Sequence, residues 1–149
     1  MELELFDEVA EALRGMVDPT HGELRVRARR WGVKVWFGPA EPQKEHYEAQ
    51  VVGARDVPAA EVLAIEIGLH AEHRDEAANE AAIGTLVRHQ EQWRKALGPD
   101  AVAGPFLGGA EHWRRVSETW ADPDLSDPDI GLEIASRLAD YIDALEPLR

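Results

Sequence analysis

Alternation of apolar and polar side chains at every second position is the feature that most constrains this chain. Four segments show it, at residues 24–29, 33–37, 46–51 and 63–70. Successive side chains of a β-strand point to opposite faces, so each segment predicts a strand with one apolar and one polar face. Short connections between the segments favour antiparallel pairing of successive strands. We therefore predict a meander whose polar face is open to solvent.

Helical periodicity appears on both sides of this meander. Residues 3–14, 75–97 and 129–146 carry apolar side chains at helical spacing, and Gly98-Pro99 ends the second of these segments. The segment HWRRVSETW, residues 112–120, predicts one more strand, and the glycine-rich DAVAGPFLGGAE before it, residues 100–111, predicts a loop. The expected order is α-β-β-β-β-α-β-α. This order predicts an α+β fold, in which an antiparallel meander sheet of about five strands carries helices packed on one face.

Length and composition exclude several classes of protein. A chain of 149 residues fits a single α+β domain over residues 1–149. The absence of cysteine excludes disulfides and cysteine-based metal sites, and it favours a reducing, cytoplasmic location. No apolar run approaches the roughly 20 residues of a membrane span, so no membrane partner is expected. The net charge of −13 repels phosphates, so nucleic acid is not an expected partner.

One basic segment stands out in this acidic chain. Five of the sixteen lysines and arginines lie between residues 25 and 34. In the predicted meander four of them share the polar face with a tryptophan, and together these side chains form a candidate surface for a partner. We predict a non-catalytic binding module, without a cofactor, that binds a protein partner or a second copy of itself. Cross-strand ion pairs with neighbouring acids would also explain the pattern without any partner. The candidate residues are Arg25, Arg27, Arg29, Lys34 and Trp36.

The alternative is a metal-dependent, nuclease-like hydrolase that uses Glu48, Glu66 and His70 of the same polar face. The segment Glu48-Ala49-Gln50, on a strand that follows a hairpin, resembles the opening of PD-(D/E)xK nucleases over about the first half of the chain. The resemblance implies a Mg²⁺ site with a second carboxylate on the preceding strand. That strand carries Lys34 and Trp36 instead. The chain is therefore not assigned to that family.

Two histidines at a predicted strand-to-helix junction, His70 and His73, are candidate metal ligands. No HExxH spacing supports them, and exposed histidines beside an acidic helix start are the simpler interpretation. The sequence also lacks a GxSxG nucleophile motif and a phosphate-binding loop. On balance the sequence favours a binding protein over an enzyme.

Overall fold

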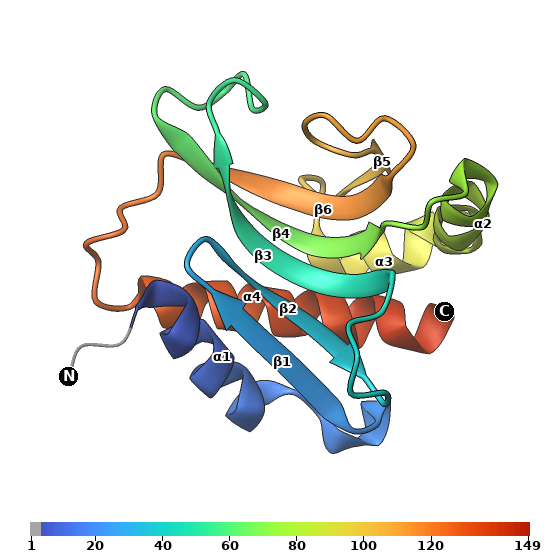
Figure 1. The fold of residues 1–149 in the computed structure, drawn as a ribbon, viewed down its shortest axis with the longest axis horizontal. Helices are drawn as coiled ribbons and strands as arrows, with labels where there is room; N and C mark the ends of the chain where they lie inside the picture. Colours follow the sequence, from blue (N-terminus) through green and yellow to red (C-terminus); the bar gives the residue numbers. More distant parts are fainter. Residues whose placement is uncertain (1–3) are drawn as a thin grey trace.

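An antiparallel sheet of six strands forms the centre of the fold in a computed structural model, which describes residues 4–149 (Figure 1). The strand order in the sheet is β1-β2-β3-β4-β6-β5. The first four strands form the predicted meander, β6 pairs with β4, and β5 lies at the far edge. The strands are β1 (Leu24–Arg29), β2 (Gly32–Phe37), β3 (Glu45–Gly53), β4 (Leu63–Ala71), β5 (Val102–Pro105) and β6 (Arg114–Ala121).

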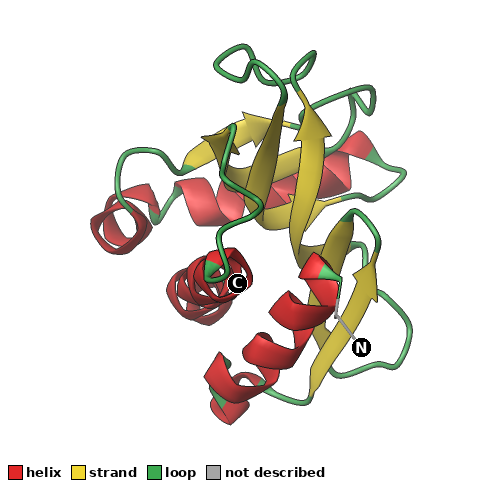
Figure 2. Ribbon diagram, turned by 90° about the vertical axis from the view of Figure 1, so that its left-hand side faces the viewer, coloured by secondary structure: helices red, strands yellow, loops and turns green. Residues whose placement is uncertain are grey.

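Helices pack on one face of this sheet, which confirms the predicted α+β architecture (Figure 2). The longest, α4, contacts α1, α3, β3 and β4, and α1 also packs against β1 and β2. No helix within residues 4–149 is both long and apolar enough to cross a membrane. The helices are α1 (Leu5–Met16), α2 (Glu76–Val87), α3 (Gln90–Leu97) and α4 (Ile130–Leu145), with short 3₁₀ turns at Pro19–His21 and Glu146–Leu148.

The structure differs from the sequence prediction in three details. The helix expected over residues 75–97 is broken near His89, where the buried Trp93 side chain donates its Nε1–H to the carbonyl of Leu86 at 2.8 Å. A short edge strand, β5, forms where a loop was expected, and an edge strand tolerates its proline. The first helix begins at Leu5, and residue 3 of the expected helix lies outside the described residues.

The core lies between the sheet and the helices. The apolar side chains of the alternating segments point into it, and Val35, Ile65 and Ile67 have no exposed surface. From α4 the buried Ile134 and Leu138 meet them, at the spacing of one helical face. The alternation in sequence therefore places every second residue of β2, β3 and β4 on the opposite, polar face.

The sequence predicted that this polar face is open to solvent, and this prediction is wrong for its central residues. His46, Glu48, Glu66 and His70 are all buried, although they point away from the helices. The loop between β5 and β6 accounts for part of this burial, because the ring of Phe106 packs edge-on against His70 with 4.7 Å between ring centroids. The polar face thus contains a buried cluster of ionisable side chains.

Candidate metal centre

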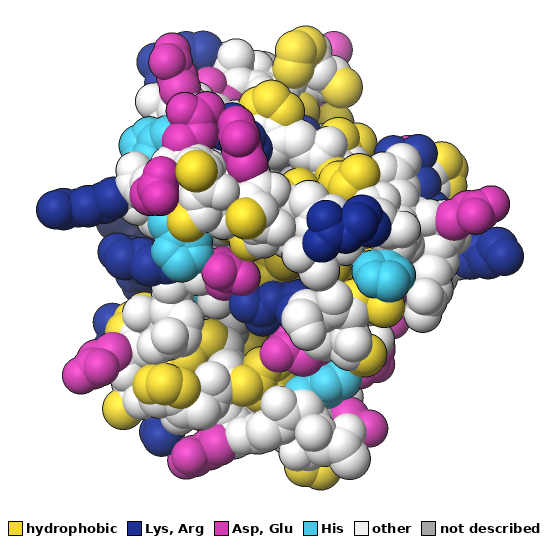
Figure 3. Space-filling view, turned by 90° about the vertical axis from the view of Figure 1, so that its right-hand side faces the viewer, with side chains coloured by type: hydrophobic (Ala, Val, Ile, Leu, Met, Phe, Trp, Pro, Cys, Tyr) yellow, Lys and Arg dark blue, Asp and Glu magenta, His cyan; other side chains and the backbone are white. Residues whose placement is uncertain are grey.

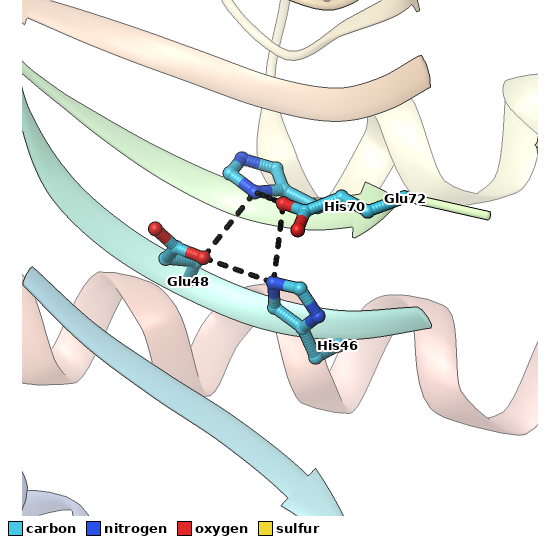
Figure 4. A group of neighbouring side chains, drawn as sticks. All are labelled: His46, Glu48, His70 and Glu72. Carbon is cyan, nitrogen blue, oxygen red and sulfur yellow. Dashed lines mark hydrogen bonds and ion pairs between the residues drawn. The ribbon is translucent and has the colours of Figure 1, made fainter. Parts of the chain in front are cut away.

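Two neighbouring strands bring four potential metal ligands together. His46 and Glu48 belong to β3, His70 belongs to β4, and Glu72 directly follows β4. His46 lies opposite His70 in the strand register, and residues two apart share a face of the sheet. The four side chains therefore converge, and one ligand atom from each lies within 4.8 Å of the other three (Figure 4).

The four nitrogen–oxygen distances in this cluster are close to those of a metal site. His46 Nε2 lies 2.9 Å from Glu48 Oε1 and 3.4 Å from Glu72 Oε2. His70 Nδ1 lies 3.0 Å from Glu72 Oε2 and 3.6 Å from Glu48 Oε1. A tetrahedral site with ligand bonds of about 2.1 Å has ligand–ligand edges of about 3.4 Å. The two longer separations already match, and the two shorter ones must open by about 0.5 Å to admit an ion.

The other nitrogen of each histidine is held outside the cluster. His46 Nδ1 lies 2.8 Å from the carbonyl oxygen of Gln43, which can only accept, so Nδ1 carries the proton and donates it. His70 Nε2 lies 3.0 Å from Oε1 of the buried Glu66. Metal-bound histidines in proteins have this kind of outer hydrogen bond, which fixes the ring and its tautomer. The nitrogens left to face the cluster are His46 Nε2 and His70 Nδ1.

Glu66 contacts the cluster through the outer nitrogen of His70 and is not one of the four potential ligands. Gln50 Nε2 donates to Glu66 Oε1 at 2.8 Å, and Ser117 Oγ donates to Glu66 Oε2 at 2.7 Å. Arg115 Nη1 in turn donates to Ser117 Oγ at 2.8 Å. Every buried side-chain nitrogen and oxygen within residues 4–149 has a hydrogen-bond partner. The cluster is therefore fully hydrogen-bonded in the protein without a metal.

Opposite charges decide the protonation of these side chains. Burial alone lowers the pKa of His70, but the carboxylates of Glu66, Glu48 and Glu72 outweigh it and raise that pKa well above its usual value. Burial likewise lowers the pKa of His46, and Glu48 and Glu72 raise it on balance. Burial raises the pKa of Glu48, and the two histidines bring it down to about 2. They also lower the pKa of Glu72 against the effect of burial. The result is a pair of imidazolium–carboxylate contacts. In each contact a proton lies between nitrogen and oxygen, where a metal ion would otherwise bind both atoms.

A pocket of about 470 Å³ opens over the carboxylate side of the cluster. The side chains of Glu48 and Glu72 are 11% and 12% exposed, whereas those of His46 and His70 are 1% and 0% exposed. Glu48 and Glu72 are therefore the members of the cluster that the pocket reaches. The pocket walls include Lys34 and Gln50 on the sheet and the aromatic side chains of Trp31, Phe106 and Trp113.

The structure divides the predicted catalytic and metal-binding residues. Glu48 and His70 lie in the cluster, and Glu66 holds His70 from outside it. His73 lies apart, with its Nε2 2.8 Å from Glu45 Oε2, so the predicted pair of His70 and His73 does not converge on one point. On the side of the molecule where β3 begins and β4 ends, acidic, basic and histidine side chains are interspersed (Figure 3).

Sequence reasoning did not select His46 or Glu72 as site residues. The signal that could have found them is a repeated His-x-Glu, at His46-Tyr47-Glu48 and again at His70-Ala71-Glu72. Each repeat places its histidine and glutamate on one face of a strand. When the two strands pair antiparallel with the histidines opposite, a local two-fold relation brings each glutamate to both imidazoles.

The predicted partner-binding residues lie on one face of β1 and β2, but they differ in exposure. Trp36 is 4% exposed and donates its Nε1–H to the carbonyl of Pro39, so it offers little area to a partner. Arg25 is half-buried and donates to the carbonyl of Gly38. Arg27 and Arg29 are exposed, and Lys34 lines the pocket over the cluster.

Comparisons with protein-family models, with curated proteins and with solved structures give no match. The chemistry of the site must therefore be argued from its donor atoms. Imidazole nitrogen suits Zn²⁺, Fe²⁺ and Ni²⁺, carboxylate oxygen also suits Mn²⁺, and Mg²⁺ and Ca²⁺ are bound mainly through oxygen. Two nitrogens and two oxygens together favour a divalent transition-metal ion.

Proposed function

We propose that this protein binds one divalent transition-metal ion through His46 Nε2, His70 Nδ1 and the carboxylates of Glu48 and Glu72. The observation that carries the proposal is that the two nitrogens of each imidazole have different partners. On each ring one nitrogen is held by an outside acceptor while the other faces both carboxylates. The outer hydrogen bonds thereby leave one nitrogen of each ring aimed at both carboxylates, which is the arrangement that an ion shared by all four groups requires.

Charge balance supports the same proposal. A divalent ion that replaces the two protons shared between imidazole and carboxylate leaves the total charge of the buried cluster unchanged. The surrounding protein, with Glu66 on one side and Lys34 on the other, therefore needs no rearrangement of charge. The metal-free protein is a folded precursor of the metal-bound form.

The pocket favours a hydrolytic use of the metal. Four protein ligands fill a tetrahedral Zn²⁺ site, but metals that accept five or six ligands keep a position free for water or substrate. A bound ion would supply a water of lowered pKa and polarise a carbonyl or phosphoryl oxygen. The carboxylates of Glu48 and Glu72 line the pocket, so a molecule bound in the pocket would lie next to the residues that would hold the ion. We therefore place a metal-dependent hydrolase ahead of a purely structural metal site.

Native mass spectrometry and thermal unfolding test the metal site directly. Purified protein is stripped of metal and titrated separately with Mn²⁺, Co²⁺, Ni²⁺ and Zn²⁺. We expect one ion per chain, and a rise of roughly 5–10 °C in melting temperature when the free ion is 100 times its dissociation constant. Uptake should be lost in His70→Gln and kept in His89→Gln, whose histidine is exposed between α2 and α3. Absence of a bound ion with all four metals, or equal uptake by the two variants, would overturn the proposal.

A second candidate function is partner binding by the β1–β2 hairpin. Trp31 at its turn is 61% exposed, with the Arg30 guanidinium 4.9 Å from the centre of its ring. Such a surface fits an acidic protein partner or a second copy of this chain, which is itself acidic. Both functions are proposed for the cytoplasm, where a chain without cysteine needs no disulfides.

The combined substitution of Arg27 and Arg29 by alanine tests this second function. If the hairpin binds a second copy, native mass spectrometry shows a dimer for the natural protein and a monomer for the variant. Equal dimer fractions in the two proteins would rule out a dimer held by these arginines. If the partner is instead an acidic protein, unchanged capture of that protein by the variant would rule out binding through these arginines.

A further inference from the structure

We propose that the pocket over Glu48 and Glu72 binds a small organic anion that carries a flat ring, with its acid group between the metal and Lys34. The inference depends on the proposed metal centre and adds the class of ligand to it. Three features of the pocket carry it: an incompletely paired cation, the charge balance of the metal-bound cluster, and aromatic walls.

Lys34 is a partly buried cation without a full partner. Its side chain is 21% exposed, and within residues 4–149 it makes no hydrogen bond. The nearest acid is Glu72, whose Oε1 lies 3.9 Å from Lys34 Nζ, beyond hydrogen-bond distance. A metal ion on Glu72 would draw that carboxylate charge toward itself and weaken the contact further. An ammonium in this position can donate to a bound acid group.

The charge balance of the metal-bound pocket is positive. A divalent ion and the carboxylates of Glu48 and Glu72 sum to zero, so the cluster does not compensate Lys34. Behind it, the positive charge of Arg115 balances the negative charge of Glu66, and Ser117 links the two side chains by hydrogen bonds. Arg29 and Arg30 add further positive charge at the rim. In a chain of net charge −13 this is a local site for an anion.

Aromatic side chains define the rest of the ligand. Trp31 and Trp113 line the pocket, and Phe106 stands between Trp113 and His70 with edge-on contacts of 5.2 and 4.7 Å to their rings. Flat apolar walls favour a planar ring over a branched or fully polar ligand. The volume of about 470 Å³ suits a small molecule. The overall negative charge opposes a long polyanion such as nucleic acid.

Isothermal titration with a set of simple acids tests this inference. The probes are benzoate and phenyl phosphate, which have a ring and a charge, acetate and inorganic phosphate, which lack the ring, and benzamide, which lacks the charge. Each is titrated into metal-loaded and metal-free protein. The variant Lys34→Gln is compared with Lys95→Gln, which removes an exposed lysine of α3 and changes the net charge equally.

We expect benzoate or phenyl phosphate to bind the metal-loaded protein at least about tenfold more tightly than its ringless counterpart, with no measurable binding of benzamide. Whether the carboxylate or the phosphate ester binds more tightly identifies the acid group. Lys34→Gln and removal of the metal should each weaken this binding by about tenfold or more, and Lys95→Gln should not.

The outcomes separate this inference from the metal proposal. Protein that takes up metal but binds none of the probes refutes the anion site and leaves the metal centre standing. Protein that takes up no metal refutes both. Equal binding by the two lysine variants, equal binding of benzoate and acetate, or tight binding of a single-stranded oligonucleotide with none of the small acids would also refute it.

Discussion

Metal binding should release about two protons per ion near neutral pH. The number follows from the hydrogen bonds of the metal-free cluster. His46 Nε2 lies 2.9 Å from Glu48 Oε1, and His70 Nδ1 lies 3.0 Å from Glu72 Oε2. At these separations each nitrogen–oxygen pair holds one proton, on whichever of the two atoms it resides. An ion that takes all four atoms as ligands must displace both protons.

The release sets the size and sign of the pH dependence. With two protons displaced, the apparent association constant rises by about 100-fold per pH unit, or about 2.7 kcal/mol. Binding weakens as the pH falls, because protons compete for the ligand atoms. The carboxylates raise the pKa of both His70 and His46. The steep dependence should therefore continue above the ordinary histidine pKa and level off only once both raised values are passed.

Calorimetry in buffers of different ionisation enthalpy measures this number directly. At one pH, the slope of the observed binding enthalpy against the buffer enthalpy gives the protons released per ion. The variant Glu72→Gln is the internal control, because its amide can donate its own N–H to a neutral His70 and should leave about one proton to displace. Stoichiometric binding without proton release would refute the reasoning, since the ion could not then occupy these four atoms.

Three further predictions concern the framework around the site. Gly68→Ala should lower the free energy of unfolding in urea by about 3 kcal/mol, because an added Cβ would lie 2.2 Å from a backbone carbonyl oxygen of β6; equal stability would contradict this. Glu66→Gln should weaken metal binding by about ten- to 100-fold, and the exposed Glu61→Gln should leave it unchanged; equal affinities would show that Glu66 does not support His70. Burial raises the pKa of Glu118, but hydrogen bonds, the strongest of them from Arg137, lower it on balance. The ionised Glu118 therefore stabilises the fold above pH 4.5, and this contribution is lost as the pH falls through the lowered pKa. In Glu118→Gln the free energy of unfolding, measured in urea at a series of acid pH values, should depend less on pH than in the natural protein, and an equal dependence would contradict this.

The sequence predicted the framework because the period of a strand is a property of the backbone. Ile65, Ile67 and Leu69 face the core as their alternation requires, and the polar residues between them face away. The burial of that polar face could not be predicted in the same way. It depends on Phe106 in the β5–β6 loop, a glycine-rich segment without periodicity whose position is set by tertiary contacts.

The candidate site could be predicted only in part, because a pair of strands also has a register. Each His-x-Glu segment puts two potential ligands on one face of a strand, but Glu48 and His70 were predicted together with Glu66 only as members of the polar face. A shift of the pairing by one residue would move one segment to the other face of the sheet. The observed register, with His46 opposite His70, is what joins the two halves. That His46 and Glu72 converge with Glu48 and His70 follows only from this register.

Stability does not by itself account for this cluster. Burying two imidazoliums beside carboxylates costs desolvation energy that their attraction recovers only in part, and apolar residues of similar volume stabilise a fold as well or better. The opposite face of the same strands shows this alternative, since Tyr47, Leu69 and their neighbours join β3 and β4 to the helices through apolar contacts. The His-x-Glu pairs therefore occupy positions where apolar side chains would serve the fold equally well. A metal ion, which would need both nitrogens and both carboxylates at once, would give the arrangement a chemical purpose that packing does not.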